Sequence, residues 1–132
     1  MVRRDVEIAL QDVKDLRKLT ELAWEDGEIQ NRVIGSLYIR AMIRGNDALC
    51  LHFLGEKPSR HHQAKSYFCR LYEEDHIDDE YSKYRNNVGD VISMKSDLEY
   101  KPEDISKGEL EKLAKKVDRF IENVVFELLG EN

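Results

Sequence analysis

Two arginines one helical turn apart, Arg40 and Arg44, interrupt an apolar stretch, and Asn46 and Asp47 follow them directly. Two guanidinium groups at this spacing can clamp a phosphate group through paired hydrogen bonds. The structural alternative is a network in which Asp47 and a carboxylate of another helix neutralise the arginines. Because polar groups are costly to bury without a partner, either arrangement accounts for this cluster. The sequence leaves both readings open.

Two adjacent histidines, His61 and His62, stand at the start of the predicted third helix. The dipole at a helix N-terminus favours the neutral imidazole, which can donate a hydrogen bond or act as a general base. Adjacent residues of a helix point in different directions, so the pair is a poor metal site. We expect no metal and no cofactor. The ordinary alternative is one histidine packed against the protein and one in solvent.

A third cluster, Lys95, Asp97, Glu99 and Tyr100, lies where the predicted fourth helix ends. Lys95 could bind a phosphate or nucleotide while the two acids hold its side chain in place. Alternatively, Lys95 offsets the negative end of its own helix, and Tyr100 packs the following loop onto the protein.

Apolar residues recur every three or four positions through most of the chain, a spacing typical of amphipathic helices. They predict five helices, at about residues 3–23, 28–54, 59–75, 79–96 and 106–129. The first helix carries the stripe Val6, Leu10, Val13, Leu16 (with Leu19) and Ala23. The second places Ile29, Val33, Leu37, Ala41, Gly45 and Ala48 on the face expected at the bundle centre.

Turn and cap residues separate these helices. Ser59 is the predicted N-cap of the third helix, Gly55 ends the second, and Ser106 with Glu109 forms a capping box before the fifth. The stretch SDLEYKPED is predicted to be the loop before the fifth helix, since Pro102 disfavours helix at the residue before it. The fold class is therefore all-α, an up-and-down helical bundle of about five helices.

Composition narrows the class of protein. The 132 residues form a single domain, 1–132, and the net charge of −6 disfavours general electrostatic binding of nucleic acid. No 18-residue apolar run occurs, so we expect no membrane span. The start MVRRDVEIAL reaches acidic residues too early for a signal peptide, which favours a soluble cytoplasmic protein. Cys50 and Cys69 are expected to be buried thiols.

An acidic run follows the predicted third helix: Glu73, Glu74, Asp75, Asp78, Asp79 and Glu80. A solvated loop is its ordinary meaning, and a docking surface for a basic partner is the alternative.

Residues 94–102, read MKSDLEYKP, and the apolar stripe after Ser106 resemble the junction between the last two helices of the HEPN family (higher eukaryotes and prokaryotes nucleotide-binding). RAMIRGNDALCLHFLG is similar to the family's central helix, and KPSRHHQA to the start of its third helix. The resemblance extends over about residues 27–125. It implies a HEPN-like bundle that forms a homodimer. It also implies a small nucleotidyltransferase partner, as in a toxin–antitoxin-like pair.

Catalytic members of this family cleave RNA without a metal, through an arginine, a polar residue and, a few positions later, a histidine. One placement begins at Arg85 and puts Asp90 where the histidine is needed. The other begins at Lys95, puts Glu99 in that position, and brings the Tyr-x-Pro sequence ending at Pro102 into register. Neither placement supplies a histidine, so the resemblance does not carry RNase activity to this chain.

The sequence therefore predicts a non-catalytic, HEPN-like regulatory module that binds a nucleotide or RNA. The candidate binding residues are Arg40, Arg44, Asp47, His61, His62, Arg85, Lys95, Asp97, Glu99 and Tyr100. Two alternatives stay open. One is a metal-independent RNase in which His61 or His62 replaces the lost base; His62 is the favoured candidate, and Arg44 would stabilise the phosphorane charge. The other is a purely structural helical dimer.

Overall fold

A computed structural model describes residues 3–130, and every regular element in that range is helical. The α-helices are α1 (Arg4–Asp26), α2 (Asn31–Leu54), α3 (Ala64–Glu73), α4 (Arg85–Ser93), α5 (Lys95–Tyr100), α6 (Lys107–Phe120) and α7 (Glu127–Leu129). Two 3₁₀ segments, His61–Gln63 and Asp79–Tyr84, precede α3 and α4. A π-helical segment, Ile121–Phe126, joins α6 to α7. The predicted all-α bundle is confirmed.

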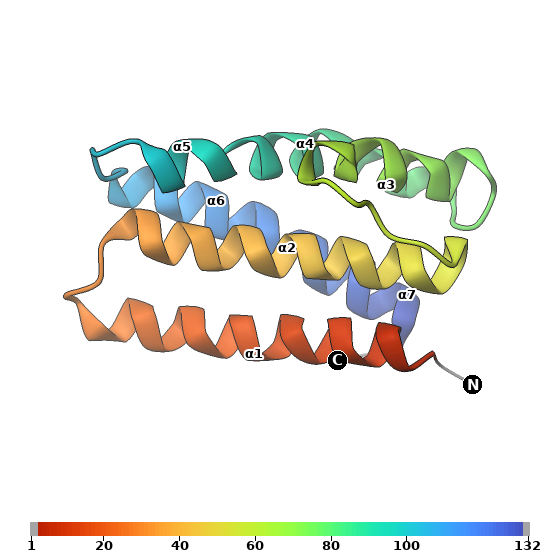
Figure 1. The fold of residues 1–132 in the computed structure, drawn as a ribbon, viewed down its shortest axis with the longest axis horizontal. Helices are drawn as coiled ribbons and strands as arrows, with labels where there is room; N and C mark the ends of the chain where they lie inside the picture. Colours follow the sequence, from red (N-terminus) through yellow and green to blue (C-terminus); the bar gives the residue numbers. More distant parts are fainter. Residues whose placement is uncertain (1–2, 131–132) are drawn as a thin grey trace.

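The helices form an elongated bundle with α2 at its centre (Figure 1). Helix α1 runs along one side of α2, and α3, α4 and α5 form a layer on the opposite side. The last helical stretch, α6 through α7, packs behind α2 and closes the core. Helices α1 and α2 run antiparallel, as do α4–α5 and the closing stretch α6–α7. Helix α3, in contrast, runs in the same direction as α2, because the segment 55–60 first returns along the bundle (Figure 1).

Helix α1 buries one narrow face against α2. Val6, Val13 and Leu16 of the predicted stripe are buried there. Leu19 is 49% exposed, so its predicted place in the stripe is wrong. Because α1 is the outermost helix and packs mainly on α2, only a thin strip of its surface is covered.

Helix α2 is buried on nearly all sides in its second half, where residues 45–51 are all buried. A Cβ atom built on Gly45 would lie 3.0 Å from Cγ2 of Val125, so glycine lets α2 and the last helix approach closely. Ile29 and Val33 were predicted to lie at the bundle centre, but they are 37% and 48% exposed. The helix begins only at Asn31, and its buried face at that end is carried by neighbouring positions such as Ile34.

The stretch predicted to be a loop is largely helical. Helix α5 covers Lys95–Tyr100, and Leu98 is buried against α2 near Gly35. The extended residue before Pro102 is Lys101, with φ −81° and ψ 137°, and the chain leaves the helix there. Burial of Leu98 stabilises the extra turn, which local sequence preference alone did not reveal.

Two other cap predictions have opposite outcomes. Ser106 caps α6, because its Oγ accepts a hydrogen bond from the backbone N–H of Glu109 at 3.1 Å. Ser59 is not a helix cap, since the third helical segment begins at His61 with Arg60 as the preceding residue. The Ser59 hydroxyl instead donates to Oε1 of Gln63 at 3.0 Å.

Within residues 3–130, no helix is both long enough and apolar enough to cross a lipid bilayer. Cys50 is buried and Cys69 is half-buried, and neither forms a disulfide. Burial raises the pKa of the Cys50 thiol to about 12, so this thiol stays protonated near neutral pH.

The N-terminus of α2 is capped by a residue far along the chain. Both carboxylate oxygens of Asp104 accept backbone hydrogen bonds, from Asn31 N–H at 3.1 Å and from Arg32 N–H at 2.7 Å. Desolvation opposes ionisation of Asp104, but the backbone N–H donors of Arg32, Asn31 and Ile105 outweigh it and lower its pKa. This carboxylate therefore fastens the loop after α5 to the central helix.

Replacing the capping carboxylate should weaken the fold. We expect Asp104→Ala to lower Tm at pH 7, because two N–H groups of α2 lose their acceptor. A lowered pKa means that this stabilisation is present above the ordinary aspartate value of 3.8 and is lost as the pH falls through the native value below it. The difference between the two proteins should therefore disappear in strong acid. Glu103→Ala, an exposed neighbour, is the control for thermal unfolding. Equal losses in both variants would contradict the cap.

Candidate functional site

Two adjoining hollows lie where α1, α2 and α5 meet the segment that leads into α3. The first hollow, of about 760 Å³, is lined by Asp12, Asp15, Leu16, Leu19, Arg40, Ile43, Arg44, Asp47, Lys57, His61, Lys95 and Glu99. The second hollow, of about 710 Å³, is lined by Ser59, Arg60, His61, His62, Lys65, Gly89, Ile92, Ser93, Lys95, Ser96, Glu99 and Tyr100. The two share His61, Lys95 and Glu99, so they form one continuous surface depression.

Arg44 lies in a network of carboxylates at the floor of the first hollow. Its Nε donates to Oδ2 of Asp12 on α1 at 2.9 Å, and its NH1 group donates to Oδ2 of Asp47 at 2.8 Å. The carboxylate of another helix that the structural reading required is therefore Asp12. Arg44 links α1 to α2, and its single positive charge is shared between the two carboxylates.

Asp47 is the most buried charged residue of the site, with 6% of its surface exposed. Desolvation raises the pKa of this carboxyl above its ordinary value, while the hydrogen bond from Arg44 and the charges of Arg44, Lys57 and His61 act to lower it. The net result is a raised pKa, and the cations around Asp47 limit the rise that burial causes.

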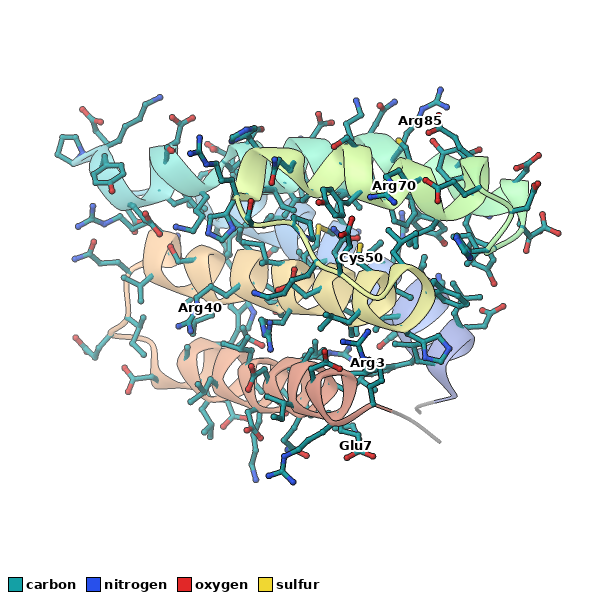
Figure 2. The ribbon with its side chains drawn as sticks, turned by 45° about the vertical axis from the view of Figure 1, so that its right-hand side comes forward. Arg3, Glu7, Arg40, Cys50, Arg70 and Arg85 are labelled. Carbon is teal, nitrogen blue, oxygen red and sulfur yellow. The ribbon has the colours of Figure 1, made fainter. Side chains whose placement is uncertain are left out.

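Arg40 differs from Arg44 although it lies one turn away on the same helix. Its side chain is exposed, lines the first hollow, and has no ion pair among residues 3–130. Figure 2 shows it beside the space between α2 and α1. Lys57 also lines this hollow, is exposed, and makes no ion pair within the described part of the chain. Two cations at this hollow are thus open to an anion from solution.

Lys95 and Glu99 separate the two hollows. The Nζ atom of Lys95 lies 2.6 Å from Oε1 of Glu99, a pair formed one turn apart on α5. Since both side chains line both hollows, this ion pair is the boundary that a larger ligand would cross.

The second hollow is the more basic of the two. Arg60, Lys65 and Lys95 line it against a single carboxylate, Glu99. The hydroxyls of Ser59, Ser93 and Ser96 line it as well. In a chain whose net charge is −6, this is a local positive region with hydrogen-bond donors.

Tyr100 lies at the rim of the second hollow with 81% of its surface exposed. The alternative in which it packs the following loop onto the bundle is therefore wrong. Helix α5 extends to Tyr100 and buries Leu98 instead, which turns the tyrosine toward solvent.

Most of the residues singled out from the sequence come together here. Those that line a hollow are Arg40, Arg44, Asp47, His61, His62, Lys95, Glu99 and Tyr100. Arg85 and Asp97 line neither. Arg85 interacts with the hydroxyl of Tyr72 and points outward from the layer of α3 and α4 in Figure 2. Asp97 lies on the outer side of α5, where it pairs with Lys101 at 3.6 Å.

The sequence analysis missed the contribution of α1 and of the segment before α3. In the sequence, Asp12 and Asp15 have the pattern of a solvated helix face. No local signal distinguishes them from the other acidic residues of the first helix. Lys57, Arg60 and Lys65 did carry a signal, because no acidic residue lies between Glu56 and Glu73. A basic stretch of this kind in an acidic chain is a candidate binding surface.

Among residues 3–130, no group of three or more His, Cys, Asp or Glu side chains is arranged to hold a metal ion. The chain also matches no protein-family model, and no curated protein is similar enough in sequence to count as a match.

The two arginines should differ sharply in their effect on stability. We expect Arg44→Ala to lower the free energy of unfolding by about 1–3 kcal/mol at pH 7, because it leaves the buried Asp47 without its partner. Since the pKa of Asp47 is already raised by burial and Arg44 opposes that rise, its loss penalises the ionised form further. The loss should thus be largest at neutral pH and shrink toward pH 4, as Asp47 takes up its proton.

Urea unfolding of each variant measures this difference. Arg40→Ala is the matched control, since Arg40 is exposed and lies on the same helix. Adding Asp47→Asn to Arg44→Ala should recover part of the loss. Equal destabilisation by the two arginine variants would show that the network does not stabilise the fold.

Proposed function

We propose that this chain is a HEPN-like, non-catalytic regulatory module that binds the phosphate groups of a nucleotide or RNA in the two hollows. One observation supports this most strongly: exposed cations without carboxylate partners gather around a depression in an otherwise acidic protein. Arg44, in contrast, is paired with two carboxylates. Arg40, Lys57, Arg60 and Lys65 make no ion pair in the described residues.

The charge distribution favours a small anion over a long one. A net charge of −6 repels a polyanion at a distance, whereas the local cations attract a phosphate that reaches the depression. Arg40 and Lys57 can contact one phosphate group in the first hollow, and Arg60 with Lys65 another in the second. This arrangement fits a nucleotide or a short RNA segment.

Tyr100 supplies a surface for a base. Its ring is mostly exposed and lies at the rim of the second hollow, within the same lining as Lys65 and Lys95. A tyrosine next to cations can stack on a nucleobase while the cations bind the phosphate.

The absence of catalysis is supported by the two residues at the motif's histidine positions. Asp90 and Glu99 occupy them, and neither can serve as the missing imidazole. Glu99 is also paired with Lys95, whose Nζ atom lies 2.6 Å from Oε1.

The regulatory role rests on the resemblance of residues 94–102 and the closing helix to the HEPN family. It implies a homodimer and a small nucleotidyltransferase partner in a toxin–antitoxin-like pair. Co-expression with such an enzyme should give a complex that co-purifies. Separate elution of the two proteins would contradict this pairing and leave ligand binding unaffected.

Ligand binding can be tested with inorganic phosphate and ATP as probes. Either should raise Tm, because a ligand selective for the native state stabilises it by mass action. We expect Arg40→Ala to weaken binding measured by calorimetry about tenfold, since a hydrogen bond to a charged group contributes about 1.5 kcal/mol. Arg85→Ala is the matched control, because Arg85 lines neither hollow. Unchanged Tm with both probes would favour a purely structural helical dimer.

The enzymatic alternative has one observation in its favour. His61 lines the same hollow as Arg44 and Lys95, so an imidazole and cations do lie near one another. His62, the histidine favoured from the sequence, lines only the second hollow. We expect mixed RNA to stay intact when incubated with the purified protein. Cleavage that His61→Ala abolishes and Arg85→Ala does not would establish a metal-independent RNase instead.

A further inference from the structure

The segment from Lys57 to Glu80 separates its charges by sign. Its first part holds four basic residues and no acidic one: Lys57, Arg60, Lys65 and Arg70. Its last part holds six acidic residues and no lysine or arginine: Glu73, Glu74, Asp75, Asp78, Asp79 and Glu80. Helix α3 (Ala64–Glu73) connects the two parts, so positive charge gathers at its N-terminus and negative charge beyond its C-terminus.

This arrangement is the reverse of what an isolated helix prefers. The helix dipole is positive at the N-terminus and negative at the C-terminus, so acidic residues stabilise the start of a helix and basic residues its end. The first turn of α3 has no acidic residue, and Glu73 and Glu74 lie at its end. Arg70 in the last turn offsets the dipole of α3, whereas the acidic side chains at and beyond its end and the basic ones before its start add to it.

Neutralisation within the chain is incomplete. Arg70 pairs with Glu74 at 2.7 Å and with Glu56 at 3.0 Å. Lys65 and Glu73, in contrast, are exposed and form no ion pair with any residue in the range 3–130. The methylene stem of Lys65 crosses Gly89 on α4, which leaves its ammonium group at the surface.

An exposed ridge runs along α3 between these charges. The ridge residues follow one another at steps of three or four positions, opposite the buried Ala64, Phe68 and Leu71: His62, Ser66 and Glu73 are exposed, and Cys69 is half-buried. The Sγ atom of Cys69 accepts a hydrogen bond from the Tyr72 hydroxyl at 3.1 Å. Figure 1 shows α3 in the layer farthest from α1, with no helix covering its outer side. The middle of the ridge is made of small side chains, so a second helix could approach closely there.

We propose that this ridge pairs with the same ridge of a second copy, with the two α3 helices antiparallel about a two-fold axis near Cys69. Positions 65 and 73 are each four residues from 69, so the axis brings Lys65 of one copy opposite Glu73 of the other, twice. The acidic end of each copy then faces the basic end of the other, and the two enhanced dipoles oppose each other. Such an isologous contact closes after two copies.

This interface rests on the homodimer of the proposed function and specifies its surface, and it does not require a bound ligand. A contact of a single short helix is small, so the dimer is weak and its attraction is sensitive to salt. Lys65 also lines the second hollow, so a phosphate bound there competes with the partner's carboxylates for the same charge.

Sedimentation of the full chain tests the pairing. We expect a dimer at about 0.1 M salt whose dissociation constant rises at least about tenfold at about 1 M salt, where electrostatic attraction is screened. A bis-maleimide of short span should link two copies through Cys69, since Cys50 is buried, and Cys69→Ser should abolish the link. A protein that stays monomeric at low salt, or a dimer that does not link through Cys69, would overturn the interface.

Charge reversal identifies the contact itself. Glu73→Lys and Lys65→Glu should each weaken the dimer about tenfold or more, and the double variant should restore it, because both pairs are then formed with opposite signs. Lys18→Glu, an exposed reversal on α1, is the matched control, and circular dichroism confirms that each variant keeps its helices. A dimer whose dissociation constant is unchanged by Glu73→Lys would refute the proposal. If the protein is monomeric but still binds phosphate, the interface is refuted and the ligand site is not.

Discussion

The burial of a charged residue in the central helix constrains the rest of this structure. Asp47 has only 6% of its surface exposed, and α2 is covered by other helices along its second half. A carboxylate in that position must be paired or protonated, and Arg44 pairs with it while also reaching Asp12 on α1. The same interaction therefore opposes the rise in the pKa of Asp47, links α1 to α2, and lines the first hollow.

Neighbouring cations of the site differ in whether a carboxylate of the chain pairs with them. Arg44 is committed to the fold by its two carboxylates, and Lys95 is held by Glu99. Arg40 is one turn away on the same helix but faces the open side of the hollow, where no acid reaches it. The surrounding network holds the depression in shape, while the unpaired cations give it a positive potential. Exposed, unpaired cations thus lie beside a structural ion network without sharing its residues.

The exposed charges at the two ends of α3 differ from the buried charge in how completely they are paired. In the core, every buried charge has a partner within the chain, as the cost of desolvation demands. On α3 the exposed charges are arranged against the helix dipole and are only partly neutralised by Arg70. Water screens exposed charges and makes this arrangement tolerable. It also leaves those charges available to a partner of complementary pattern.

Local patterns in the sequence were sufficient for the fold class and for several boundaries. The periodic apolar stripes identified an all-α bundle, Gly55 ended α2, and Ser106 capped α6. The helicity of 95–100 was missed, because its main stabilisation is the burial of Leu98 against a helix distant in sequence. The exposure of Ile29 and Val33 was missed for a related reason. Periodicity reveals that a helix has an apolar face, but not how far its neighbours extend to cover it.

For the candidate site, the sequence by itself determined the residue types: paired arginines, adjacent histidines, and a lysine with acids near the end of the fourth helix. Only the tertiary structure decided which of them meet. It placed Arg40, His61 and Lys95 around one depression, committed Arg44 to Asp12, and left Arg85 outside. The physical reason is that pairing and burial depend on distances between helices. Those distances are set by packing of the whole bundle, whereas sequence spacing fixes neighbours only within one helix.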